Sequence, residues 1–139
     1  MGAPKSSSRL FVYGTLMPGQ SNFSRIKPYV LATRPGETDG ILVDLGSFPA
    51  LLEGDGVVRG VLLEMEQAAL RITDGIEGYH GEREGSLYWR KEVTVRLESG
   101  EETVAWTYFF ARPKQIADRP RPIVRLDEGR PVFSWRGQP

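Results

Sequence analysis

The segment from Lys91 to Phe110 constrains the fold most strongly, because its pattern predicts two adjacent antiparallel β-strands. Hydrophobic residues alternate with polar ones in each half, and a period of two is typical of a strand with one buried face. Ser99-Gly100 between the halves is a turn signal that favours a hairpin. The residues expected to share a face are Val93, Val95 and Leu97 in the first strand and Val104, Trp106 and Tyr108 in the second.

Other strand signals run through the chain, whereas helix signals are scarce. Hydrophobic runs predict further strands at residues 10–13, 40–48 and 57–65. The best helix candidate is residues 65–79, where Ala69, Ile72 and Ile76 fall at helical spacing and a glycine at 75 or 78 can end the helix. A shorter helical piece is expected at residues 21–26. The sequence therefore predicts a mostly β domain with one or two helices.

The ends of the chain differ from this middle part. Residues 1–8 lack the apolar run of a signal peptide and are expected to form a flexible leader, which favours a cytoplasmic protein. The segment 112–139, which is interrupted by Pro113, Pro120, Pro122 and Pro131, is expected to be a Pro/Arg-rich C-terminal extension beyond a domain at 9–111. Residues 132–135 of that extension can still pair as an edge strand. No stretch approaches the roughly 18 apolar residues of a membrane span, so no membrane partner is expected.

Composition excludes several kinds of chemistry. The 139 residues contain no cysteine and one histidine, so thiol catalysis, thiolate metal sites and multi-histidine mechanisms are ruled out. Neither a metal nor a cofactor is expected. Lys+Arg and Asp+Glu both number 18, so no overall field attracts nucleic acid, and a proline-broken basic tail is usually only solvated. Chemistry has to come from carboxylates, hydroxyls, tyrosines and the backbone.

The turn Tyr13-Gly14-Thr15-Leu16, directly after the first strand, is the first candidate site. Successive N–H groups in a turn that contains glycine can form a concavity suited to a carboxylate or an oxyanion. Taken alone, the pattern is more typical of an ordinary strand-ending turn. No Gly-Lys-Ser/Thr follows it, so it is not a phosphate-binding P-loop.

The second candidate site is the pair Asp74 and Glu77 at the end of the expected helix. Two acids three residues apart share a helical face, and such pairs are more often solvated than catalytic. If the Glu77 side chain faced an enclosed, partly apolar space, desolvation would raise its pKa toward a value useful for proton transfer. The pattern leaves both interpretations open.

A third candidate is a set of strand aromatics that includes Tyr13, Tyr88 and Tyr108. Aromatic residues on strands usually belong to the core, and a buried tyrosine usually finds a partner for its hydroxyl. Base stacking is a weaker interpretation because the net charge is zero. His80, in the charged loop 80–86, is expected to be solvated.

Six segments in this order resemble the γ-glutamylcyclotransferase-like family, which includes γ-glutamylamine cyclotransferases and the plant AIG2-like proteins. The resemblance covers about residues 9–110, and its strength lies in the register of the six segments rather than in any one of them. They are FVYGTLMPGQSN, GILVDLGSFPAL, VVRGVLLEM, TDGIEGY, LYWRKEVTV and AWTYFF.

The resemblance implies an α+β fold, a small mixed β-barrel with a few flanking helices, and assigns roles by position. Its glycine turn matches residues 13–16, whose N–H groups would hold the γ-glutamyl part of the substrate. The catalytic glutamate of its Asp-x-x-Glu-Gly element matches Glu77, and its pocket tyrosines match Tyr88 and Tyr108. Asn22 matches an asparagine that often follows the turn.

The implied reaction converts a small γ-glutamyl amine or γ-glutamyl amino acid to 5-oxoproline by intramolecular aminolysis. The nucleophile belongs to the substrate, so a chain without cysteine is adequate. Glu77 would act as base and then as acid. A non-catalytic binding or interaction module with the same fold is the alternative. The leaving amine and the oligomeric state stay open.

Overall fold

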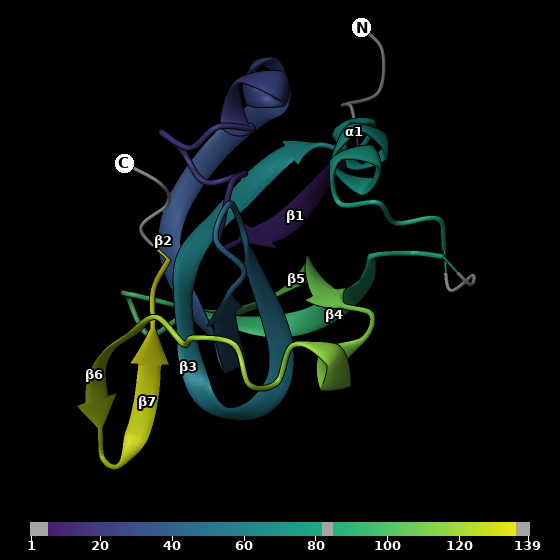
Figure 1. Ribbon diagram of the computed structural model, residues 1–139. Coiled ribbons are helices and arrows are strands. Elements are labelled where there is room, and N and C mark those ends of the chain that lie inside the picture. The colour runs from purple at the N-terminus through teal and green to yellow at the C-terminus, as the bar shows by residue number, and fades with distance from the viewer. Residues whose placement is uncertain (1–5, 82–84, 136–139) are drawn as a thin grey trace, which may run out of the picture.

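The computed structural model describes residues 6–81 and 85–135, which form a closed mixed β-barrel with one α-helix and a two-stranded addition (Figure 1). Residues 1–5 of the expected leader and 82–84 of the loop 80–86 lie outside the described residues. The strands are β1 (Ser7–Val12), β2 (Val30–Asp44), β3 (Pro49–Glu66), β4 (Tyr88–Leu97), β5 (Glu102–Phe110), β6 (Ile123–Asp127) and β7 (Arg130–Phe133), and the helix is α1 (Ala69–Ile76). Short 3₁₀ turns occur at Phe23–Arg25, Lys27–Tyr29 and Pro113–Gln115.

Five strands close the barrel in the order β1-β5-β4-β2-β3, with β3 pairing back to β1. The β1–β5 pair is parallel, whereas β1–β3, β2–β3 and β4–β5 are antiparallel. Where β1 ends beside β3, the two backbones come so close that a Cβ at Gly60 would collide with the Val12 carbonyl oxygen. Glycine at residue 60 therefore allows the barrel to close.

The predicted hairpin is confirmed, because β4 and β5 pair antiparallel from Tyr88–Phe110 to Arg96–Glu102. On β5 the barrel interior is lined by the Ala105 and Thr107 face. The opposite face, which carries Trp106 and Tyr108, looks outward, and Tyr108 is buried there in the core cluster that also contains residues of α1. The alternating sequence of β5 thus indicated that the strand has two different faces. The closure of the barrel determined which of these faces points inward.

The run Leu10–Tyr13 is apolar throughout because both of its faces are buried. Leu10 and Val12 pack in the outer core with α1, whereas Phe11 and Tyr13 pack in the core to which all five barrel strands contribute. A strand that is covered on both sides has no polar face, so it shows a continuous run rather than alternation.

Several element boundaries differ from the sequence-based expectation. The helix is shorter than 65–79, because Met65 and Glu66 end β3 in pairing with Ser8 and Ser7. The strand expected at 40–48 begins at Val30 and ends at Asp44. The helical piece expected at 21–26 is a single 3₁₀ turn at Phe23–Arg25.

The segment 112–139 supplies a β6–β7 hairpin on the far side of the barrel from α1 (Figure 1). Strand β7 also pairs in parallel with β3, at Val132–Val57 and Phe133–Val58, so the edge strand is β6 rather than 132–135. None of the helices formed by residues 6–81 and 85–135 has the length and apolar character that crossing a membrane requires.

Candidate active site

The turn after β1 is fixed by hydrogen bonds that leave its own N–H groups unused. The Met17 N–H donates to the Gly14 carbonyl at 3.0 Å. Asn22 holds Thr15 twice, from its backbone N–H to the carbonyl at 2.8 Å and from Nδ2 to Oγ1 at 2.9 Å. In the part of the chain that the structure describes, the N–H groups of Gly14, Thr15 and Leu16 donate to no protein acceptor. Asn22, which had no expected role, therefore acts as a brace for the turn.

Glycine at position 14 also has a packing reason. A Cβ at Gly14 would lie 2.7 Å from Cγ and Cδ of Pro49, closer than carbon atoms can approach without displacement. Pro49 begins β3, so this contact brings the turn after β1 against the start of a strand 35 positions further along the chain. The absence of a Cβ therefore lets Pro49 form one wall of the hollow beside the turn.

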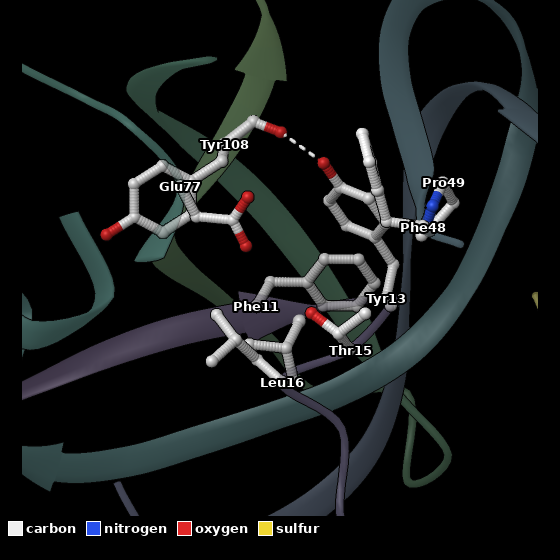
Figure 2. A pocket seen from close by; sticks show the side chains of 10 residues that line it. Phe11, Tyr13, Thr15, Leu16, Phe48, Pro49, Glu77 and Tyr108 are labelled. Carbon is white, nitrogen blue, oxygen red and sulfur yellow. Dashed lines mark hydrogen bonds between the residues drawn. The ribbon is translucent and has the colours of Figure 1, made fainter. Parts of the chain in front are cut away.

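Glu77 lies where α1 ends. Its N–H donates to the Thr73 carbonyl at 2.9 Å, and Gly78, with a φ of +63°, turns the chain out of the helix. The residue as a whole is partly buried, but its carboxyl group points into the pocket (Figure 2). Burial away from water raises the pKa of the Glu77 carboxyl from its ordinary 4.5 to about 7.

Three tyrosines form or support the walls of the pocket around this carboxyl. The Tyr13 hydroxyl donates to the Tyr108 carbonyl at 2.6 Å, the bond drawn in Figure 2. The Tyr108 ring lines the pocket, while its hydroxyl points away from it to Asp74 Oδ1, at 2.6 Å. Tyr88 lies behind the wall, where its hydroxyl donates to the Pro49 carbonyl at 2.8 Å. Burial raises the pKa of all three tyrosines, so their hydroxyls stay protonated near neutral pH.

These groups surround one small pocket, and the empty space in it and in the open solvent directly in front of it is about 310 Å³. Six of the seven residues to which the resemblance assigns a role line it, and Tyr88 does not; Asp74 of the second candidate pair does not line it either. Four further lining residues were not singled out as site residues. Phe11 and Val12 directly precede the turn, and Phe48 and Pro49 lie in the segment GILVDLGSFPAL that contributes to the resemblance. The lining residues are Phe11, Val12, Tyr13, Gly14, Thr15, Leu16, Phe48, Pro49, Glu77 and Tyr108.

Glu77 is the ionisable carboxylate among the residues that line this pocket. Within residues 6–81 and 85–135, no group of three or more His, Cys, Asp or Glu side chains is arranged to hold a metal ion. His80 is exposed, as expected, and its backbone N–H donates a hydrogen bond to Ser86 Oγ at 2.9 Å. A carboxyl with a pKa near 7 can take up and release a proton, and unpaired N–H groups can bind a carboxylate or an oxyanion.

Comparison with known proteins gives one family and one fold. A family model described as γ-glutamyl cyclotransferase, AIG2-like, matches residues 10–129. A γ-L-glutamyl-butirosin B γ-glutamyl cyclotransferase of Niallia circulans is 36% identical over 112 residues, which are 79% of this chain and 71% of that protein. A putative γ-glutamylcyclotransferase of Methanocaldococcus jannaschii is 29% identical over 73% of this chain and 82% of its own length. The crystal structure of an AIG2-like protein from Mus musculus superposes with a TM-score of 0.69 at 26% identity, covering 83% of this chain and 85% of that one.

Proposed function

This chain belongs to the AIG2-like γ-glutamyl cyclotransferase family, and from that premise we propose a specific reaction and a residue for each step. As an enzyme of this type, it would act on a small γ-glutamyl amine or γ-glutamyl amino acid. The γ-glutamyl group would close to 5-oxoproline, and the amine would be released. The observation that supports this proposal best is an acid with a pKa near 7 in the same pocket as three unpaired N–H groups.

The bond changes are those of an intramolecular aminolysis. The substrate's α-nitrogen bonds to its own γ-carbonyl carbon, and the bond from that carbon to the leaving nitrogen breaks. The α-ammonium begins with three hydrogens and the lactam nitrogen ends with one, so two protons must leave it. One proton completes the leaving amine and the other converts it to its ammonium form, so no proton is gained or lost overall.

Glu77 would move the proton that matters for the rate. Its carboxylate would take a proton from the α-ammonium and then deliver it to the departing nitrogen, as base and then as acid. A pKa near 7 suits both roles at neutral pH, since neither protonation state is strongly disfavoured. An exposed glutamate with an ordinary pKa would be a poor acid in the second step.

The N–H groups of Gly14, Thr15 and Leu16 would hold the negative parts of the substrate, either its α-carboxylate or the oxyanion that forms at the γ-carbon. Because Asn22 already braces this turn, the donors would need little rearrangement on binding. Holding the extended γ-glutamyl chain in a bent form accounts for a large part of the expected acceleration. Tyr13 and Tyr108 would shape the pocket, and Tyr88 would support it through Pro49.

The test is release of 5-oxoproline from a panel of γ-glutamyl amines and γ-glutamyl amino acids, followed by chromatography of both products. We expect the wild-type protein to form 5-oxoproline and free amine in equal amounts. Glu98→Gln is the matched control because Glu98 is exposed, and it should not change the rate. Binding of these compounds without any release of 5-oxoproline would instead identify a binding module and overturn the proposal.

A further inference from the structure

A polar network behind the pocket connects three elements that are far apart in the chain. The Tyr108 hydroxyl on β5 lies 2.6 Å from Asp74 Oδ1 and 2.7 Å from Thr73 Oγ1, both on α1. Arg90 on β4 brings its Nε to 3.2 Å from the same Asp74 oxygen. One carboxylate oxygen of the helix is thus held by both neighbouring strands.

The network lies outside the pocket although it adjoins it. Neither Asp74 nor Arg90 is among the lining residues, and the Tyr108 hydroxyl points away from the enclosed space (Figure 2). The side chains of Asp74 and Arg90 are 21% and 20% exposed, so water screens their ion pair less than it screens a surface pair. These groups therefore lie outside the pocket that contains the Glu77 carboxyl.

Arg90 also contacts two aromatic rings. Its guanidinium lies 4.7 Å from the centre of the Trp106 ring and 5.6 Å from that of the Tyr79 ring. Its buried Nε makes no hydrogen bond to the described residues, so its contact with Asp74 is an ion pair without hydrogen-bond alignment. The two aromatic rings and the negative charge of Asp74 together position the Arg90 guanidinium, whose positive charge neutralises the Asp74 carboxylate.

Glu77 follows Asp74 by three residues, slightly less than one helical turn. Its N–H bonds to the Thr73 carbonyl at 2.9 Å, so the two residues that Tyr108 contacts are linked through the backbone to Glu77. On its other side, Tyr108 accepts the Tyr13 hydroxyl at its carbonyl. Tyr108 therefore connects the helix end that carries the pocket acid with the turn that carries the N–H groups.

We propose that the side chains of Asp74 and Arg90 and the Tyr108 hydroxyl form a positioning lock that holds the Glu77 carboxyl at its working place, so that these three groups control turnover from outside the pocket. The role in turnover rests on the proposed function, whereas the placement of Glu77 does not. An error of about 1 Å in placing a catalytic group can lower a rate about 10²-fold, so a small release of the helix end is sufficient to matter.

The test combines Tyr108→Phe, Asp74→Leu and the double variant. Tyr108→Phe keeps the ring that lines the pocket and the carbonyl that binds Tyr13, and it removes only the two hydroxyl contacts to the helix, at Asp74 and Thr73. We expect each single variant to lower kcat about 10-fold with KM within about 2-fold, measured well below the unfolding temperature. The two losses in kcat should not multiply in the double variant, because both changes break the bond between the Tyr108 hydroxyl and Asp74. Tyr29→Phe is the matched tyrosine control, because Tyr29 is partly buried but does not line the pocket, and it should leave kcat unchanged.

A second readout does not require turnover. ¹³C NMR of protein labelled at glutamate follows the titration of the Glu77 carboxyl, and Glu77→Gln assigns its signal. The titratable groups that interact electrostatically with it are the hydroxyls of Tyr13 and Tyr88, which stay neutral near pH 7, so the signal reports the placement of Glu77. We expect a wild-type midpoint near 7 that falls toward 4.5 in Tyr108→Phe, as the freed carboxyl gains access to water.

The outcomes separate the two proposals. Unchanged kcat and an unchanged Glu77 midpoint in both single variants would overturn the lock while the proposed reaction stands. Losses in kcat that multiply in the double variant would also overturn it. A wild-type protein that releases no 5-oxoproline, but whose Glu77 midpoint falls in Tyr108→Phe, would overturn the proposed reaction and support the lock.

Discussion

Replacing Glu77 by glutamine tests the pocket acid in two independent ways. The amide keeps the size and shape of the carboxyl group, but it cannot take up and pass on a proton at neutral pH. General acid–base catalysis by one side chain typically contributes about 10²- to 10⁴-fold to a rate. We therefore expect Glu77→Gln to lower kcat by at least about 10²-fold and to keep the fold.

The same substitution should change how the free energy of unfolding depends on pH. Burial raises the pKa of the folded-state carboxyl from 4.5 to about 7, so the folded protein binds this proton more tightly than the unfolded chain does. That contribution to stability is fully present below pH 4.5 and is lost as the pH rises through about 7. At about 1.4 kcal/mol for each pH unit, the loss in the wild-type protein amounts to about 3 kcal/mol.

Urea unfolding of both proteins at pH 4 and pH 9, followed by circular dichroism, measures this difference. Glu77→Gln lacks the titrating group, so it should gain about 3 kcal/mol relative to the wild-type protein between these two pH values. Equal pH dependence in the two proteins would show that the carboxyl is not desolvated. Near-normal formation of 5-oxoproline by the variant would remove Glu77 from the mechanism.

Further predictions concern the pH profile and the pocket walls. Below about pH 7 the wild-type kcat/KM should rise about tenfold per pH unit as Glu77 loses its proton, and a flat profile from pH 5 to 8 would contradict its role as base. Gly14→Ala places a Cβ 2.7 Å from the Pro49 ring and should lower the free energy of unfolding by about 1–3 kcal/mol, together with kcat/KM, as urea unfolding and kinetics can measure. Tyr13→Phe removes the buried bond to the Tyr108 carbonyl and should destabilise by about 1–3 kcal/mol, whereas an unchanged unfolding midpoint would show that this bond contributes nothing.

Local features of this protein follow from the order of its residues. The β4–β5 hairpin could be predicted because alternation and a Ser-Gly turn lie within one short segment. The largely exposed first part of β2, residues 30–39, has no such pattern. It is a strand because β3 pairs with it throughout and β4 with part of it, which no local rule indicates.

The candidate site also has features that the sequence indicated and features that it did not. The residue pattern leaves Asp74 and Glu77 open between a solvated surface pair and a functional site, and the family resemblance is what assigns Glu77. Neither the pattern nor the resemblance indicated that Pro49 fits against Gly14 or that Asp74 holds the Tyr108 hydroxyl.

By itself the sequence determined a mostly β domain, a glycine turn after the first strand, an acid at the end of the helix and a chemistry without thiols. Only the tertiary structure decided that the turn and the acid share one pocket, that Tyr88 stands behind its wall, and that the Glu77 carboxyl loses enough water to raise its pKa. The reason is that backbone periodicity and turn geometry depend on neighbouring residues. Desolvation and wall contacts depend instead on residues dozens of positions apart, which meet only when the barrel closes.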